Sequence, residues 1–147
     1  MSNIIQDPLL NYRFRIEIEG EGMESMGFSK MSELSNETKT TPYKEGGLNN
    51  RTYYLPEHTE YSTITLEHGL SLDQSLYDWR QDVIDGNMLD ALKDGLIKIY
   101  REDGEYDIWE FHGAWPSKLV VSGFDATGSG DILVESIELV IERFERY

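Results

Sequence analysis

Two polar stretches on either side of a turn constrain the architecture of this chain most: Asn36-Glu37-Thr38-Lys39-Thr40-Thr41 and Thr52-Tyr53-Tyr54-Leu55. Threonine and tyrosine favour strands, and the intervening Gly46-Gly47-Leu48-Asn49-Asn50 is typical of a turn. Pro42 cannot donate to a central ladder. The hairpin has no apolar face for the domain's own core to hold, and isolated hairpins are marginal in water. We therefore expect residues 36–54 to form an arm that is either floppy or held by something outside the domain.

Most of the remaining chain is predicted to be antiparallel sheet. Residues 12–19 alternate apolar Tyr12, Phe14, Ile16 and Ile18 with charged side chains, which indicates a half-buried strand. Asp103-Gly104 is a strong hairpin turn, and Trp115-Pro116 is expected to bend the chain. Further strands are expected at residues 27–33, 61–68, 96–101, 106–112, 118–121 and 132–144. The fold class is therefore α+β and mainly antiparallel, about eight strands around one helix.

The helix is predicted to begin near residue 71. Ser71 is a candidate N-cap, and Gln74 three residues later would complete a capping box. Gly86 is suited to the C′ position, and a further helical turn is expected around residues 88–92. One apolar stripe is formed at helical spacing by Leu72, Leu76, Trp79 and Val83.

Size and charge exclude several classes of protein. With 147 residues the chain is predicted to be a single domain, residues 1–147. Its 28 acidic and 13 basic residues give a net charge of −15, which disfavours binding to nucleic acid or anionic membranes. The charge suits either a solubilising surface or an acidic wall past which polyanions or protein cargo slide.

Targeting and anchoring signals are not expected. The chain has no cysteine, which excludes a disulfide-stapled fold. No apolar run approaches the roughly 18 residues of a membrane span, and the first residues lack the pattern of a signal peptide. We expect a soluble protein without a membrane anchor, made in the cytosol and leaving the cell by lysis or within a particle.

The sequence predicts no enzyme, cofactor or metal site. His58, His68 and His112 lack zinc-site spacing and are interpreted as surface or packing residues. Glu17 and Glu19 would share a strand face, but nothing distinguishes them from chance carboxylate pairs. The glycine-rich segment 125–131 lacks the ligand pattern of an EF-hand and reads as a hairpin connection. Nucleophile-elbow, phosphate-loop and dinucleotide motifs are absent from the sequence.

Unpaired strand edges favour self-association. Edges can be blunted or paired with another chain. Head-to-tail pairing between copies produces a closed ring, or a helical stack where there is also a rise. The pattern alone therefore allows a hypothesis in which the arm lies on a neighbouring copy.

Several segments in order resemble the tail-tube proteins of contractile phage tails and phage-tail-like injection systems. They are Asp7-Pro8-Leu9-Leu10-Asn11-Tyr12-Arg13-Phe14, Tyr43-Lys44-Glu45-Gly46-Gly47, Ile64-Thr65-Leu66-Glu67-His68-Gly69, Leu76-Tyr77-Asp78-Trp79-Arg80, Ala114-Trp115-Pro116 and Val134-Glu135-Ser136-Ile137-Glu138-Leu139. One departure is Leu119-Val120-Val121, where family members often carry an aromatic residue. The resemblance runs from about Asp7 to the C-terminus.

The resemblance implies a β-sandwich or small barrel with one flanking helix and a projecting hairpin. Six copies would join their sheets into a hexameric inner β-barrel, and rings would stack helically inside a sheath as a conduit for DNA or protein. Its implied partners are the chain itself, sheath protein, baseplate and terminator components and passing cargo, without specific nucleic-acid binding. Assembly in the bacterial cytoplasm and incorporation into a phage tail or a released particle are expected.

Residue roles follow from placing the arm and sheet in such a tube. The lumen candidates are Thr63, Thr65 and Glu67, which lie on the polar face of the strand that follows the arm. The expected inter-subunit arm residues are Glu37, Lys39, Thr41, Tyr43, Lys44, Glu45, Arg51 and Tyr53. Two alternatives stay open: an initiator or terminal tube component of the same machine, and a monomeric β-sandwich carbohydrate-binding module.

Overall fold

The computed structural model describes residues 13–20, 23, 27–44, 46, 51–128 and 130–147. Every strand pairing in these residues is antiparallel. The elements in chain order are β1 Phe14–Ile18, β2 Lys30–Met31, β3 Asn36–Tyr43, β4 Tyr53–Tyr61, β5 Ile64–Gly69, α1 Ser75–Ile84, α2 Met88–Ala91, β6 Lys93–Tyr100, β7 Tyr106–Ser122, β8 Val134–Val140 and β9 Arg143–Arg146. The predicted fold class is confirmed, and the further helical turn expected around residues 88–92 is present as α2.

The body is one bent sheet of seven strands in the order β1-β6-β7-β8-β5-β2, with β9 also paired to β7. The long strand β7 belongs to both halves of this bent sheet. Its first half pairs with β6 and β9, and its second half pairs with β8. The sheet stays open, and no closed barrel forms within the described part of one chain. The small-barrel alternative for the monomer is therefore wrong.

The apolar core fills the space between the two halves of the bent sheet. Ile16 and Ile18 on β1 face it, as do Leu66 on β5 and Leu139 on β8, all at 0–1% exposure. Alternation with charged neighbours places these side chains on one face, as the sequence pattern predicts. Helix α1 closes one side of the core and packs against β7.

Helix α1 is anchored by one buried tryptophan. Trp79 is 2% exposed, and its indole Nε1 donates a hydrogen bond to the carbonyl oxygen of Ala91 on α2 at 2.6 Å. This bond ties the two helices together and satisfies the only polar atom of a large buried side chain. Leu76 is also buried, so the predicted apolar stripe is confirmed for these two positions.

The predicted start of the helix is wrong. Helix α1 begins at Ser75, its N-cap position is Gln74, and no side chain caps it there. Asp73 instead accepts hydrogen bonds from the backbone N–H and hydroxyl of Ser75 at 2.9 and 2.6 Å, which lower the pKa of the Asp73 carboxyl. This local turn takes the place of the Ser71 capping box, and Leu72 is left 99% exposed outside the helix. Gly86, with φ of 85°, ends the helix as expected.

The two strands expected at residues 106–112 and 118–121 are instead one continuous strand, β7, and the bend expected at Trp115-Pro116 lies within it, where its pairing passes from β6 to β8. Pairing with β6 ends at Ala114, and the β8 register shifts between Pro116 and Lys118. A proline without an N–H is tolerated at such an irregular, one-sided position. The single strand expected at residues 132–144 is instead divided into β8 and β9 as the chain passes from one half of the sheet to the other.

Two further elements differ from expectation. The strand expected at residues 27–33 reduces to the two residues of β2. Strand β4 extends to Tyr61, well beyond the expected stretch at residues 52–55, and includes His58. Neither α1 nor α2, the helices of the described residues, has the length and apolarity to cross a membrane.

Candidate assembly interface

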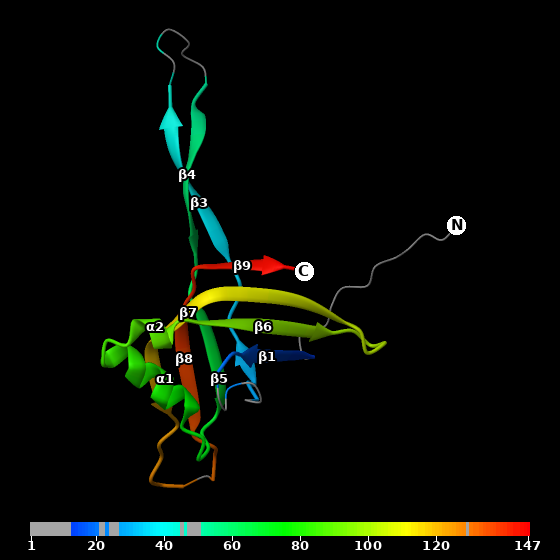
Figure 1. The fold of residues 1–147 in the computed structure, drawn as a ribbon, viewed down its shortest axis with the longest axis vertical. Coiled ribbons are helices and arrows are strands. Elements are labelled where there is room, and N and C mark those ends of the chain that lie inside the picture. Colours follow the sequence, from blue (N-terminus) through cyan, green and yellow to red (C-terminus); the bar gives the residue numbers. More distant parts are fainter. Residues whose placement is uncertain (1–12, 21–22, 24–26, 45, 47–50, 129) are drawn as a thin grey trace.

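Strands β3 and β4 form a two-stranded ribbon that projects from the body (Figure 1). In the described chain they pair with each other and not with the seven-stranded sheet. All of β4 except half-buried Tyr61 is exposed, and all of β3 except half-buried Lys39. The ribbon therefore leaves both of its faces and both of its edges open. This geometry confirms a projecting hairpin, and the part of it at residues 45 and 47–50 lies outside the described residues.

Charged side chains occupy one face of the ribbon near the body. Lys39 Nζ lies 3.6 Å from a carboxylate oxygen of Glu37 and 3.8 Å from one of Glu60. His58 Nε2 donates to Glu60 Oε1 at 2.9 Å, and this bond, followed by the charge of Lys39, lowers the pKa of Glu60. These pairs are solvent-exposed, so each contributes little to stability, typically ~0.2–1 kcal/mol.

The same face becomes apolar toward the tip. Tyr43 pairs in register with Tyr53, and Thr41 pairs with Leu55. Directly paired residues share a face, so Tyr43, Tyr53 and Leu55 form one patch, with exposures of 48%, 44% and 50%. We call these three residues the tip patch. Tyr54 lies on the opposite face and is 67% exposed.

The predicted arm residues lie on or beside the projecting ribbon. The described members are exposed except for half-buried Lys39, and they lie on β3, on β4 or at the adjoining ends of the hairpin: Glu37, Lys39, Thr41, Tyr43, Lys44, Arg51 and Tyr53. Glu45 lies outside the described residues. Their contact with another copy stays a prediction.

The lumen candidates lie close together at β5, on a face of the sheet that carries little net charge. Thr63 is exposed just before β5, and Thr65 and Glu67 point away from the core on β5. Glu67 is in register with Lys30 on β2, Thr65 is in register with Glu138 on β8, and Glu138 is in register with Lys118 on β7. This face of the sheet is therefore close to charge balance, and its role as a lumen stays a prediction.

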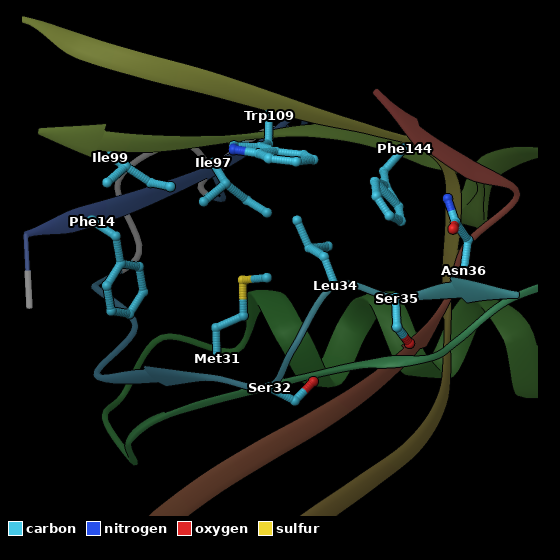
Figure 2. A pocket seen from close by; sticks show the side chains of 10 residues that line it. All are labelled: Phe14, Met31, Ser32, Leu34, Ser35, Asn36, Ile97, Ile99, Trp109 and Phe144. Atoms are coloured by element: carbon cyan, nitrogen blue, oxygen red, sulfur yellow. The ribbon is translucent and has the colours of Figure 1, made fainter. Parts of the chain in front are cut away.

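A groove of about 880 Å³ lies where the arm joins the body (Figure 2). Sheet strands β1, β6, β7 and β9 supply one wall, and the segment from Met31 to Asn36 supplies the other. Its apolar lining residues are Phe14, Met31, Leu34, Ile97, Ile99, Trp109 and Phe144, and its polar ones are Ser32, Ser35 and Asn36. All of the apolar ones except buried Ile97 are partly buried and packed on the core. Sequence reasoning missed this groove, because its walls come from segments far apart in the chain.

Aromatic contacts hold the groove wall beside the arm. The rings of Trp109 and Phe144 are 5.8 Å apart, and Phe144 meets the ring of Tyr61 edge-on at 5.1 Å. Tyr61 is the last residue of β4, and the Ser62 N–H donates to the Ser35 carbonyl at 3.0 Å. The base of the arm is therefore packed against the body, whereas its tip is not.

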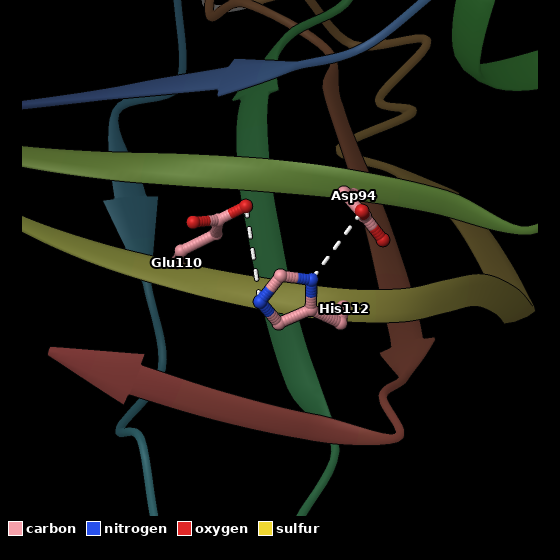
Figure 3. Close-up of side chains that lie close together, drawn as sticks. All are labelled: Asp94, Glu110 and His112. Atoms are coloured by element: carbon pink, nitrogen blue, oxygen red, sulfur yellow. Dashed lines mark ion pairs between the residues drawn. The ribbon is translucent and has the colours of Figure 1, made fainter.

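The outer face of the β1-β6-β7-β9 half-sheet carries a polar cluster (Figure 3). His112 Nδ1 lies 3.3 Å from Asp94 Oδ2, and His112 Nε2 lies 3.7 Å from Glu110 Oε1 and 2.9 Å from Glu145 Oε1. Both ring nitrogens thus face carboxylates. Sequence spacing could not reveal the cluster, because register between neighbouring strands brings it together. Glu110 of this cluster also forms a hydrogen bond with the side chain of Tyr147, and this bond raises the pKa of Tyr147 to about 12.

His68 and the Glu17 and Glu19 pair are held in contacts within the body of the fold. His68 Nε2 lies 2.6 Å from Glu135 Oε1, and both residues are buried, at 6% and 4% exposure. Glu17 lies 3.3 Å from Lys98 Nζ, and Glu19 accepts a hydrogen bond from the Asp94 N–H at 2.8 Å. These contacts account for His68, Glu17 and Glu19 as parts of the fold.

Comparison with known proteins places this geometry in context. A chain of an extracellular contractile injection system, PVC, in its extended sheath–tube complex, is 29% identical, with 97% of this chain and 93% of that one covered and a TM-score of 0.78. A chain of the PVC sheath/tube terminator is 27% identical (98% and 99% covered, TM-score 0.77). One from the anti-feeding prophage baseplate shares the fold at 21% identity (97% of each chain, TM-score 0.81).

Among curated proteins no match was found. The family model described as T4-like virus tail tube protein gp19 matches residues 10–145. This range contains every strand and helix of the described fold except the last residue of β9. The chain therefore belongs to the T4-like virus tail tube protein family.

Proposed function

We propose that this chain is the structural subunit of a tube in a contractile tail or injection particle. Six copies form a ring, and rings stack helically inside a sheath to make a conduit for DNA or protein. The subunit performs no chemistry. Family membership supports the tube, and similarity to chains in sheath–tube, baseplate and terminator assemblies supports sheath, baseplate and terminator proteins as partners.

One observation carries the proposal: an exposed two-stranded ribbon projects from a folded body. A two-stranded hairpin is marginally stable alone, and open strand edges attract another chain. Both needs are met if the ribbon lies on a neighbouring copy. Because the arm of one copy and its receiving surface on the next are different patches, the contact is heterologous and gives rings or helical stacks.

The experiment compares the intact chain with a variant lacking residues 41–50. Size-exclusion chromatography and negative-stain electron microscopy are expected to show rings or tubes for the intact chain. The variant is expected to stay folded and soluble, as a monomer or single ring, and to form no tubes. Circular dichroism of the variant controls for folding, because the described residues among those deleted do not belong to the core. Tubes of normal length from the folded variant would contradict the role of the arm.

A second candidate is a terminal component of the same machine. Similarity to the sheath/tube terminator chain, at 27% identity, is close to the 29% found for the sheath–tube complex. A main tube subunit is expected to polymerise into tubes of unlimited length, whereas a terminal component stops at one or a few rings. The length distribution in micrographs of the purified chain distinguishes the two.

The monomeric carbohydrate-binding alternative makes an opposite prediction. It requires a stable 17.0 kDa monomer that binds a saccharide. Glycan binding by an unassembled monomer would support this carbohydrate-binding alternative.

We propose that the protein is assembled in the bacterial cytoplasm into a phage tail or an injection particle, with cargo passing through the lumen.

A further inference from the structure

Among the described residues, two apolar surfaces are left open at opposite ends of the arm, and we propose that they bind each other between copies. The tip patch of one subunit, Tyr43, Tyr53 and Leu55, docks in the groove at the arm base of the next subunit. This inference rests on the proposed tube function and specifies which face of the arm makes the contact. It also specifies which surface of the neighbour receives the arm.

The lining and the volume of the groove suit an apolar partner. Phe14, Leu34, Ile99 and Trp109 point into it from both walls (Figure 2). Its volume of about 880 Å³ lies within the ~300–1,000 Å³ range of ligand-sized sites. An open apolar surface of this kind in a protein that self-assembles marks an interface. Serines and an asparagine along one wall can hydrogen-bond tyrosine hydroxyls that enter with the rings.

The tip patch has the matching chemistry. Two tyrosines and a leucine lie side by side on one face of the ribbon, roughly half exposed. Tyrosine is enriched at the cores of protein interfaces, because its ring is apolar and its hydroxyl tolerates a wet rim. The charged cluster of Glu37, Lys39 and Glu60 is on the same face near the body. Only the tip half of this face can enter an apolar groove without burying ion pairs.

The arm cannot fill its own groove. Asn36, the first residue of β3, lines the groove, and Tyr43 is seven residues further along the strand. At roughly 3.3 Å per residue, the patch lies about 23 Å from the groove it would have to reach. The ribbon is extended and points away from the body (Figure 1). The occupant of the groove is therefore the arm of a second copy.

Disulfide trapping tests the contact directly, because the chain contains no cysteine. The test variant carries Tyr53→Cys with Leu34→Cys, placing one thiol in the tip patch and one in the groove. The matched control carries Tyr54→Cys with Leu34→Cys, with the arm thiol on the opposite face of the ribbon. A disulfide needs Cα atoms within about 7 Å. Any bond between these positions must therefore join two chains.

Each variant is assembled, oxidised and run on non-reducing gels, with electron microscopy of the same samples. We expect a ladder of covalent oligomers for the test pair, at least tenfold stronger than for the control. Equal ladders, or no ladder in samples that contain tubes, would overturn the docking while leaving the tube function standing. A third variant, Ile5→Cys with Leu34→Cys, checks the N-terminal segment. A ladder or an internal bond there in place of the test ladder would assign the groove to that segment and also overturn the docking.

Failure of the tube function looks different. If the cysteine-free chain forms no rings or tubes under any assembly condition, the proposed function fails and the docking fails with it. The micrographs therefore separate the two outcomes before the gels are read.

Discussion

Replacing Gly95 with alanine tests how tightly the ring of Phe111 on β7 packs against the neighbouring strand β6. Gly95 lies on β6 directly opposite Phe111 on β7. A Cβ at this position would lie 2.2 Å from the Phe111 Cζ atom and 2.8 Å from both Cε atoms. The ring is 0% exposed, so it cannot move into solvent to make room. The substitution therefore forces a shift in the core of the protein.

The expected loss in the free energy of unfolding follows from this overlap. Overpacking a core typically costs ~1–3 kcal/mol, and a separation of only 2.2 Å from a fully buried ring falls toward the upper end. We expect a loss of about 2–3 kcal/mol for Gly95→Ala, or roughly 5–10 °C in the unfolding midpoint of a domain of this size. Urea and thermal unfolding followed by circular dichroism measure it, at a protein concentration where the chain is unassembled.

The control is Gly27→Ala, where an added Cβ meets no atom within 4 Å of the described structure. That change is expected to stay within about 0.5 kcal/mol. The double variant Gly95→Ala with Phe111→Leu is expected to lose less stability than the sum of its single changes, since the two sites share one space. Equal stability of Gly95→Ala and Gly27→Ala would refute the packing described for β6 and β7.

Three further changes follow from single contacts. Glu135→Ala leaves buried His68 without its partner at 2.6 Å, and an unfolding-energy loss of roughly 3–5 kcal/mol is expected in urea denaturation; a loss under 1 kcal/mol would mean the pair is not needed. Trp79→Phe removes the hydrogen bond from α1 to α2 and is expected to cost about 1–3 kcal/mol, measured in the same way. If Trp79→Phe were as stable as the wild type, the packing of α1 against α2 would not depend on this hydrogen bond. Tyr53→Ser is expected to reduce tube yield in negative stain at least fivefold, whereas Tyr54→Ser, on the other face, leaves it near wild type. Equal effects of the two serine variants would contradict a one-sided arm contact.

Local periodicity predicted much of the body. Alternation at Phe14, Ile16 and Ile18 placed β1 and its buried face, and Asp103-Gly104 placed the β6–β7 hairpin. In these stretches each residue's preference and its tertiary environment agree. The arm followed from the reverse observation, a β-prone stretch at residues 36–41 that is polar on both faces; the apolar patch nearer its tip was not predicted.

Predictions were wrong where a tertiary contact or a competing turn decided the outcome. A hydrogen-bonded turn at Asp73 replaces the expected Ser71 cap, and the strands expected at residues 106–112 and 118–121 join into β7, which can run through Pro116 because β6 no longer pairs with it there. Such outcomes depend on which neighbours a strand has, which periodicity does not contain.

Only part of the candidate interface could be predicted from the sequence. Exposure of the arm could be predicted, because it depends on composition within one segment. The groove could not, because Phe14, Leu34, Trp109 and Phe144 come together only when β1, β7, β9 and the start of the arm fold onto one another. The tip patch required the β3–β4 register, since a shift by one residue would move Tyr53 to the other face of the ribbon.

Cryo-electron microscopy of the purified, assembled chain tests the central claim most directly. We expect six-fold rings stacked into a tube, with residues 36–43 and 53–60 buried against a different copy from the one that carries them. A map in which the protein stays a single self-contained particle would contradict the account, and so would an assembly in which this ribbon touches no other subunit.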